Sequence, residues 1–194
     1  MKFIFDKIMS FFGLIFCLPI FFVVYILIKI KMPEGNPFFL QKRVGLNGKL
    51  FTLFKFRTMK LSHSNSSISI AGENRITPLG AILRKYKIDE LPALLNVLKG
   101  DMSFVGPRPD VEGYADKLEG EDKNVLKLRP GITGPASLKY SNEEEILASV
   151  KNPVEYNNTV IYPDKVKINL DYYNNNSFFG DLKLIKNTIF RTNY

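Results

Sequence analysis

The chain has 194 residues, of which 45% are hydrophobic, and its formal net charge is +8. This length is enough for one domain with its own core, and a basic excess suits anionic headgroups or phosphates. The single cysteine, Cys17, and the single histidine, His63, exclude intrachain disulfides and Cys/His zinc sites. A Ser-His-Asp mechanism would have to use His63, which stands in a polar, serine-rich stretch typical of a loop. Lysine and arginine are dispersed and form no basic arm, so we expect no nucleic-acid partner.

An uncharged segment runs from Ile8 to Ile28 and consists mostly of Phe, Ile, Leu and Val. As a helix, a segment of this length would span roughly 30 Å, the thickness of the hydrocarbon core of a bilayer. It lacks a small-residue cleavage site, so we do not expect a signal peptide. The plain interpretation is a helix that crosses the membrane once.

Two features instead favour a helix that enters and leaves the membrane on the same side. Pro19 lies inside the uncharged segment, where a proline removes a backbone hydrogen bond and bends a helix. Basic residues flank both ends of the segment, and a crossing helix cannot satisfy the positive-inside rule at both ends. These flanking residues are Lys2, Lys7, Lys29, Lys31, Lys42 and Arg43. From these residues alone, the re-entrant helix and the crossing helix both remain open.

A β-hairpin is predicted after this segment. Asn47-Gly48 separates two extended runs, residues 38–44 and 49–59, and this dipeptide between such runs predicts a two-residue hairpin turn. The second run alternates aromatic and basic side chains, which predicts one apolar and one basic strand face. The alternating residues are Phe54, Lys55, Phe56 and Arg57. The serine-rich residues 60–72 that follow predict a flexible loop.

The most informative stretch runs from Arg84 to Pro109. Leucines at helical spacing predict a helix that begins near Asp89 and Glu90 and ends at Gly100. At a helix N-terminus, the dipole and the free N–H groups keep a carboxylate ionised and can receive a phosphate. Arg84 precedes this point and Arg108 follows it in a Gly-Pro-Arg-Pro turn, and the arginine fork suits phosphate oxygens. Taken alone, the pattern is more typical of an Asp that merely caps a helix.

Further elements are predicted around this stretch. Residues 75–87 predict a helix with Thr77 as its N-cap and Pro78 in its first position. Residues 128–134 predict a tight loop that carries Arg129. Three more helices are predicted, over residues 141–150, 162–173 and 178–190. The last helix is amphipathic and basic, so it suits either the membrane interface or the protein core.

The run from Lys87 to Pro109 reads Lys-Ile-Asp-Glu-Leu-Pro-Ala-Leu-Leu-Asn-Val-Leu-Lys-Gly-Asp-Met-Ser-Phe-Val-Gly-Pro-Arg-Pro. It resembles the signature of the bacterial sugar transferases, the monotopic phosphoglycosyl transferases. Residues 54–59 and 129–133 also resemble segments of this family, and the resemblance extends over nearly the whole chain. Members carry a re-entrant membrane helix that is broken at a Ser-Pro pair. The corresponding pair here is Leu18-Pro19, so the side-chain hydroxyl of the family pattern is absent.

The resemblance implies an α+β, mainly helical monotopic protein at the cytoplasmic face of the bacterial inner membrane. Residues 1–32 would form the re-entrant helix, and residues 33–194 a cytoplasmic catalytic domain with a β-hairpin and interfacial amphipathic helices. Membrane lipids would be partners, and a homodimer remains open.

The implied reaction moves a sugar-1-phosphate from a UDP-sugar to undecaprenyl phosphate, releases UMP, and begins glycan assembly. Asp89 would attack the sugar-bearing phosphate and form a covalent intermediate, with Mg²⁺ bound at Asp89. Glu90 would position or deprotonate a reacting group. Phosphates would be held by Lys55, Arg57, Arg84, Arg108 and Arg129. Two alternatives are a non-catalytic membrane scaffold for glycan-assembly enzymes and a direct single-step transfer in which Asp89 serves only the metal.

Overall fold

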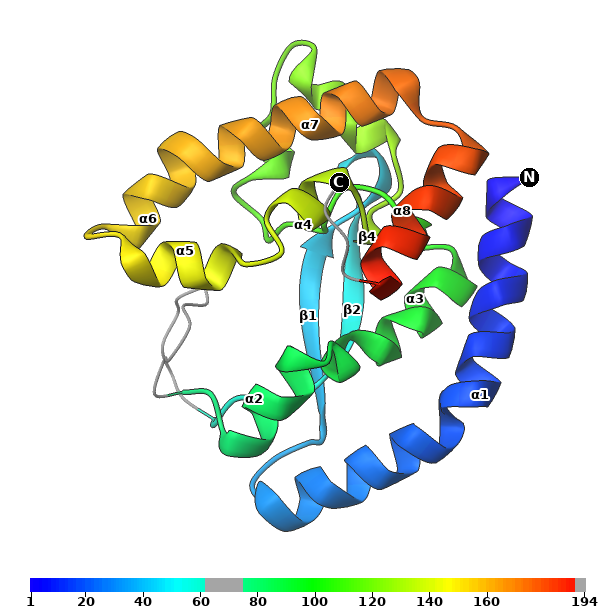
Figure 1. Cartoon of the computed structure of the whole chain (residues 1–194), viewed down its shortest axis with the longest axis vertical. Coiled ribbons are helices and arrows are strands. Elements are labelled where there is room, and N and C mark those ends of the chain that lie inside the picture. Colours follow the sequence, from blue (N-terminus) through cyan, green and yellow to red (C-terminus); the bar gives the residue numbers. More distant parts are fainter. Residues whose placement is uncertain (62–74, 191–194) are drawn as a thin grey trace.

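The computed structural model describes residues 1–61 and 75–190. A long N-terminal helix, α1 (Lys2–Lys31), leads into a β-hairpin formed by β1 (Phe38–Val44) and β2 (Leu50–Phe56). Helices surround this hairpin, and α1 runs along the outside of the molecule (Figure 1). The remaining α-helices and strands are α2 (Pro78–Lys85), α3 (Leu94–Lys99), β3 (Ser103–Val105), β4 (Gly131–Thr133), α4 (Pro135–Lys139), α5 (Glu143–Ser149), α6 (Pro153–Tyr156), α7 (Tyr162–Asn175) and α8 (Phe178–Phe190). The prediction of a mainly helical chain with one β-hairpin is confirmed.

Helix α1 is long and apolar enough to cross a membrane by length and composition, and no other helix in the described residues is. It contains Pro19 and changes direction part-way along its length (Figure 1), as expected where a proline interrupts the hydrogen-bond ladder. Its outward side chains are apolar and exposed, including Phe16 at 80% and Phe22 at 67% exposure. The other described residues leave this apolar surface uncovered, and an exposed apolar surface of this extent marks a site of interaction.

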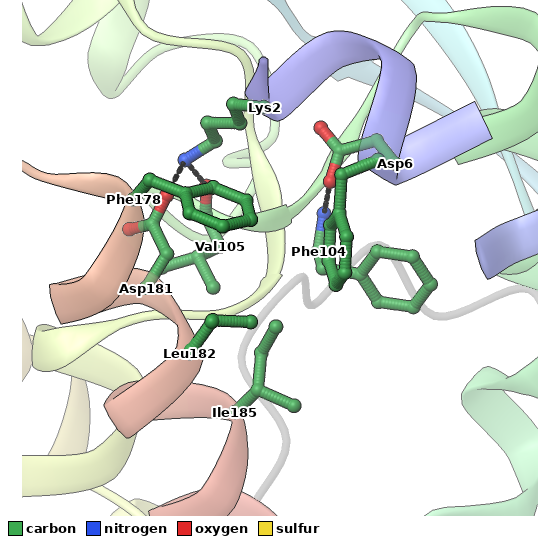
Figure 2. Close-up of a pocket in the computed structure, with 9 residues that line it drawn as sticks. Lys2, Asp6, Phe104, Val105, Phe178, Asp181, Leu182 and Ile185 are labelled. Atoms are coloured by element: carbon green, nitrogen blue, oxygen red, sulfur yellow. Dashed lines mark hydrogen bonds and ion pairs between the residues drawn. The ribbon is translucent and has the colours of Figure 1, made fainter. Parts of the chain in front are cut away.

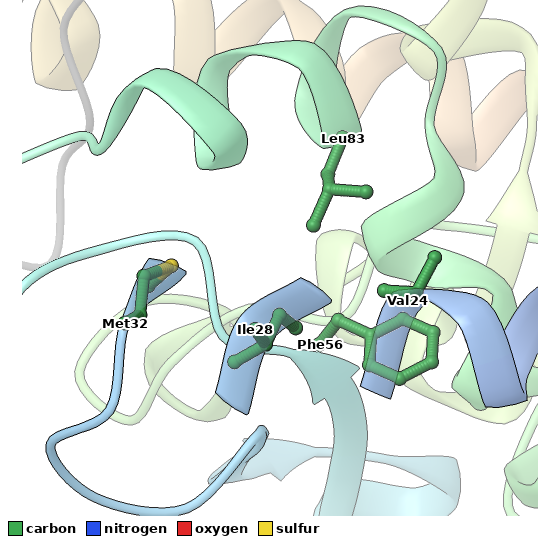
Figure 3. Packing of buried hydrophobic residues seen from close by; sticks show 5 residues of the cluster. All are labelled: Val24, Ile28, Met32, Phe56 and Leu83. Carbon is green, nitrogen blue, oxygen red and sulfur yellow. The ribbon is translucent and has the colours of Figure 1, made fainter. Parts of the chain in front are cut away.

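Both ends of α1 contact the same globular body. Near the N-terminus, Lys7 donates a hydrogen bond from Nζ to the carbonyl of Leu98, at a distance of 2.9 Å. Near the C-terminus, Val24 and Ile28 pack against Phe56 at the end of β2. Figure 3 shows this cluster, which Met32, directly after α1, and Leu83 of α2 complete. The bent helix is thus attached to the domain along its inner side at both ends.

The hairpin turn is longer than predicted. Asn47 and Gly48 do adopt the left-handed conformation, with φ of 54° and 76°. However, Val44 pairs with Leu50, so five residues rather than two connect the strands. Within this loop, the amide of Gly45 donates to the carbonyl of Lys49 at 2.9 Å. The two-residue turn was therefore a wrong prediction, although the residues chosen for it do lie at the bend.

The prediction of one apolar and one basic face on β2 holds only in part. Phe56 packs on α1, as an apolar face requires. The opposite face begins with Phe51 and Leu53, which are buried against Val97 of α3. Only beyond these residues does this face become basic, at Lys55. The hairpin thus packs on α1 through Phe56 and on α3 through Phe51 and Leu53.

Most of the remaining helices occur where they were predicted. Thr77 caps α2, since its Oγ1 accepts a hydrogen bond from the amide of Gly80 at 2.9 Å, and Pro78 occupies the first helical position. Helices α5, α7 and α8 correspond to the three later predictions. Helix α8 packs Leu184 into the core but leaves Phe179 81% exposed.

The predicted loop at residues 128–134 is instead partly a strand. Its residues Gly131–Thr133 form β4, which pairs in parallel with β3 through Ser103 and Gly131 and through Val105 and Thr133. A three-residue strand that pairs with a distant segment leaves no periodic signal in the sequence. Most of the serine-rich loop predicted at residues 60–72 lies outside the described residues, as does His63.

Candidate active site

Asp89 and Glu90 lie in a short 3₁₀ helix, Ile88–Ala93, that leads into α3. The sequence predicted a regular helix from this point, but the α-helical bonds begin only at Leu94. Pro92 supplies the reason, because a proline has no N–H to donate and its ring crowds the carbonyl four residues earlier. Lys87, directly before the 3₁₀ helix, adopts a left-handed conformation with φ of 57°. The two carboxylates therefore project from a tight turn rather than from a regular helix N-terminus.

The carboxylate of Asp89 is buried, with 7% of the residue exposed. Within the part of the chain that the structure describes, its Oδ1 has no hydrogen-bond partner. Burial raises the pKa of Asp89, and the charge of Glu90 raises it further, while Lys55, Arg84 and Lys87 oppose the rise. This direction is opposite to the one expected from a helix dipole. A buried acceptor without a partner is costly in a folded protein, so this oxygen is a candidate for contact with a ligand.

Glu90 links two cations from different elements. Its Oε1 accepts a hydrogen bond from Lys55 Nζ at 2.9 Å and another from Arg108 Nη2 at 2.8 Å. Burial would raise the pKa of Glu90, but the charges of Arg108, Lys55 and Lys87 together hold it well below its usual value. Glu90 is therefore a fixed anion at neutral pH that sets the positions of Lys55 and Arg108.

A pocket opens beside this ion-pair cluster. Its charged lining residues are Glu90, Lys55, Arg108 and Arg43. An apolar floor is formed by Leu53, Ala93, Met102 and Ile132. Three cations face one carboxylate here, and such an excess of positive charge on a low-dielectric floor favours a polyanion such as a diphosphate.

Arg43 is the site residue that sequence reasoning missed, because it was counted only among the basic residues flanking the membrane segment. Its Nη1 donates to the carbonyl of Pro109 at 3.0 Å. Burial lowers the pKa of Arg43 to about 10, and the neighbouring charge of Arg108 acts in the same direction. A guanidinium with this pKa remains charged at neutral pH and adds to the positive field of the pocket.

Arg84 approaches the site from α2. Its charge lowers the pKa of Asp89, and its guanidinium forms an ion pair with Glu144 of α5. Of the five predicted phosphate-binding residues, the structure thus brings Lys55, Arg84 and Arg108 together with Asp89 and Glu90.

The other two predicted phosphate-binding residues lie elsewhere. Arg57 is buried, with 6% exposed, and its guanidinium donates to the carbonyls of Met32 and Glu34 at the end of α1. Arg129 donates from Nε to the carbonyl of Gly100 at 3.1 Å, and its guanidinium lies 4.7 Å from the centroid of the Phe3 ring. Arg57 therefore binds the chain just after α1, and Arg129 binds the end of α3. Neither residue lines the pocket.

The site offers few protein ligands to Mg²⁺. No cluster of three or more His, Cys, Asp or Glu side chains that could hold a metal occurs in the described ranges 1–61 and 75–190. Mg²⁺ is nevertheless commonly bound by one or two carboxylates together with substrate phosphates. The carboxylate of Asp89, the residue before Glu90 of the cationic pocket, fits this mode, in which the substrate supplies the other ligands.

Comparison with known proteins identifies the family. The family model described as bacterial sugar transferase matches residues 1–193. The chain belongs to the bacterial sugar transferase family.

Several curated bacterial sugar transferases are similar to this chain over most of its length. An uncharacterized sugar transferase, EpsL of Bacillus subtilis, is 36% identical over 89% of this chain and 78% of its own length. A UDP-glucose:undecaprenyl-phosphate glucose-1-phosphate transferase of Caulobacter vibrioides is 35% identical over 88% of this chain. A transferase of the same name from Escherichia coli is 33% identical over 89% of this chain. The chain spans 61% of the Caulobacter protein and 36% of the Escherichia coli protein.

Proposed function

We propose that this sugar transferase moves a sugar-1-phosphate from a UDP-sugar to undecaprenyl phosphate and releases UMP. The observation that carries the proposal is the buried carboxylate of Asp89, whose Oδ1 has no partner in the described residues. Asp89 directly precedes Glu90, which lines the pocket together with three cations. The relatives from Caulobacter vibrioides and Escherichia coli are named for the transfer of glucose-1-phosphate to undecaprenyl phosphate, which supports the reaction class. The sugar itself is left open, because no contact described here selects one.

The reaction proceeds in two displacements at phosphorus. In the first, Oδ1 of Asp89 attacks the phosphate that carries the sugar, a bond between Oδ1 and phosphorus forms, and the bond to UMP breaks. In the second, a phosphate oxygen of undecaprenyl phosphate attacks the same phosphorus, and Asp89 leaves as a carboxylate. Burial suits Asp89 to this role, since a carboxylate stripped of water and unpartnered is more reactive than a solvated one.

The cations make the approach of two anions possible. Lys55 and Arg108 face the pocket where the diphosphate would bind, and Arg43 extends the positive surface. Glu90 keeps Lys55 and Arg108 in fixed positions, so that little reorganisation is needed when charge develops on the leaving group. Mg²⁺ held at Asp89 would supply further neutralisation of the diphosphate when bound.

We further propose that α1 is a re-entrant membrane helix, at the cytoplasmic face of the bacterial inner membrane. Both ends of α1 contact the same globular body, through Lys7 at one end and Ile28 at the other. A crossing helix would separate these ends by the thickness of the bilayer. The change of direction in α1 and its exposed apolar outer side suit insertion into one leaflet.

Reporter tags at residues 1 and 194 test this topology. We expect both tags to report the cytoplasm, because both ends of α1 attach to one domain. Protease protection in spheroplasts provides an independent measurement of the same point. A periplasmic N-terminus would overturn the re-entrant helix and restore a single crossing.

A release assay tests the transfer itself. We expect the purified chain, in detergent with Mg²⁺ and undecaprenyl phosphate, to release UMP from at least one member of a panel of UDP-sugars. The lipid product should carry the sugar and both phosphates by mass spectrometry. If no UDP-sugar in the panel yields UMP or a lipid product, the non-catalytic scaffold becomes the better explanation.

A further inference from the structure

A buried polar cluster joins the first two turns of α1 to β3, away from the pocket described above. Figure 2 shows Lys2 and Asp6 of α1 facing Val105 and Phe104 of β3, with Asp181 of α8 beside them. Asp6 and Asp181 are 3% and 4% exposed. Charged side chains that are buried to this extent need hydrogen-bond or ion-pair partners.

Every donor of the Lys2 ammonium group has an acceptor. Its Nζ lies 2.8 Å from the carbonyl oxygen of Val105, 2.8 Å from the hydroxyl of Tyr172 and 2.6 Å from Oδ2 of Asp181. An ammonium group has three N–H donors, so this set is complete. Lys2 of α1 thus binds β3, α7 and α8 at the same time.

Asp6 contacts the same strand one residue earlier. Its Oδ1 accepts a hydrogen bond from the amide of Phe104 at 3.3 Å. Lys2 and Asp6 therefore hold a backbone carbonyl and a backbone amide on neighbouring residues of β3. Two such bonds fix both the position and the orientation of the strand relative to α1.

The strand leads directly to the active site. Gly106 follows Val105, and its amide donates to the carbonyl of Thr133 at 2.9 Å. A Cβ on Gly106 would lie 2.2 Å from the carbonyl oxygen of Arg129, so the backbone here follows one tight path. Pro107 then restricts the chain again, and the next residue is Arg108, which binds Glu90.

We propose that Lys2 and Asp6 are positioning residues, which set the place of Arg108 in the active site through β3. The position of the start of α1 thereby affects the pocket. When Lys2 and Asp6 bind β3, the strand is fixed in place and Arg108 can bind Glu90. This inference rests on the proposed function for its kinetic readout, so a second readout is chosen that does not depend on turnover.

The kinetic test is a double-mutant cycle. Lys2→Met removes the three hydrogen bonds at nearly constant size, and we expect kcat/KM for the UDP-sugar to fall about tenfold. In an Arg108→Ala background, the same change should lower kcat/KM by less than about twofold, because the residue it positions is gone. Equal fold-losses in both backgrounds would show that Lys2 acts independently of Arg108 and would overturn the proposal.

A matched control is available elsewhere on the surface. Lys139 pairs with Asp164 at 2.6 Å, and Tyr140 donates to the same carboxylate, so this trio repeats the Lys–Asp–Tyr chemistry outside β3. Lys139→Met should leave kcat/KM unchanged within about twofold. At position 6, Asp6→Asn retains an acceptor for the amide of Phe104 and should keep more activity than Asp6→Ala. The reverse order would contradict a role for this hydrogen bond.

Amide hydrogen exchange supplies the readout that is independent of turnover. Lys2→Met and Asp6→Ala should each increase exchange across residues 103–108, while the amides of α7 retain their protection. If the wild-type chain releases no UMP but exchange responds in this way, the proposed function fails and the positioning contact stands. Unchanged exchange at residues 103–108 in both variants would overturn the positioning role, whatever the activity.

Discussion

Replacing Asp89 with asparagine is expected to abolish UMP release. The side chain keeps its shape, but the amide cannot attack phosphorus, so we expect turnover to fall by a factor on the order of 10⁴ or more. The structure gives Asp89 the environment of a nucleophile: it is buried, its Oδ1 has no partner in the described residues, and burial raises its pKa. Asp171→Asn is a suitable control, because Asp171 is exposed on α7 and its described side-chain contact is with Asn175.

Loss of activity alone would not separate a nucleophile from a metal ligand. Wild-type protein incubated with UDP-sugar and Mg²⁺, but without undecaprenyl phosphate, should gain the mass of one sugar phosphate on the peptide that contains Asp89. UMP should appear in a burst equal to the amount of protein, which is the kinetic mark of covalent catalysis. If UMP instead requires undecaprenyl phosphate and no adduct can be trapped, transfer occurs in a single step and Asp89 is a metal ligand.

The pH dependence of the same step follows from the direction of the pKa shift. The nucleophile must be ionised, so the rate of adduct formation should fall as pH decreases through the pKa of Asp89. Burial raises this pKa, so the fall should begin at a higher pH than for an ordinary aspartate. Bound Mg²⁺ would lower the pKa of Asp89, whereas the anionic diphosphate would raise it further. Comparison of kcat/KM with the burst rate separates the free protein from the complex.

Much of the local structure could be predicted from the sequence, because neighbouring residues such as caps and prolines determine it. Thr77 and Pro78 specify the start of α2 through a hydrogen bond and a fixed φ, with no help from distant residues. Pro19 similarly predicts a change of direction in α1. The long signature around Asp89 identified the family, and residues 1–193 match it.

The sequence did not predict that Arg43 lines the pocket, and the register of the hairpin explains why. A two-residue turn at Asn47-Gly48 would pair Leu46 with Lys49, which places Lys42 rather than Arg43 on the face of Lys55. The five-residue loop shifts the pairing by one, so that Arg43 lies opposite Phe51 on the same face as Lys55. A shift of one residue in register exchanges the two faces of a strand, and here it determines which basic residue reaches the pocket.

Arg57 and Arg129 illustrate the other limit of sequence reasoning. The sequence does not distinguish an arginine that binds phosphate from one that binds backbone carbonyls, since the guanidinium can donate to either acceptor. Only the fold places Arg57 at the end of α1 and Arg129 at the end of α3. The pairing of β3 with β4 is likewise nonlocal, and the connection from Lys2 to Arg108 depends on it.

Glu90→Gln is expected to damage both stability and activity, because it removes the shared anion from two cations. Lys55 and Glu90 side chains are 18% and 13% exposed, so this pair is largely desolvated, whereas Arg108 is 44% exposed and can turn to solvent. Removing one partner of a buried ion pair typically costs about 3 kcal/mol. We therefore expect a loss of about this size in the free energy of unfolding, measured by denaturant titration in detergent. Glu155→Gln, on the exposed surface, should change stability by less than about 0.5 kcal/mol.

A second substitution distinguishes the ion pair from other causes. Lys55→Met in the Glu90→Gln background removes the unpaired buried cation, so part of the lost stability should return. Activity should not return, because the pocket then lacks two of its four charged groups. If Lys55→Met destabilises the Glu90→Gln protein further, the pair is not the source of the loss.

The pH profile decides whether Glu90 is an organising anion or a general base. The charges of Arg108, Lys55 and Lys87 hold its pKa well below the usual value, and a carboxylate so strongly stabilised in its ionised form is a weak base. Its contribution to stability should be fully present above the pKa of an unfolded glutamate, about 4.3. It should be lost as pH falls through the lower pKa of the folded state, so the stability difference between wild type and Glu90→Gln should be constant from pH 6 to 8. Glu90→Gln should lower kcat/KM at every pH in this range by a constant factor, on the order of 10². A Glu90→Gln protein in which the acid limb of the rate profile disappears would instead identify Glu90 as the group that accepts a proton.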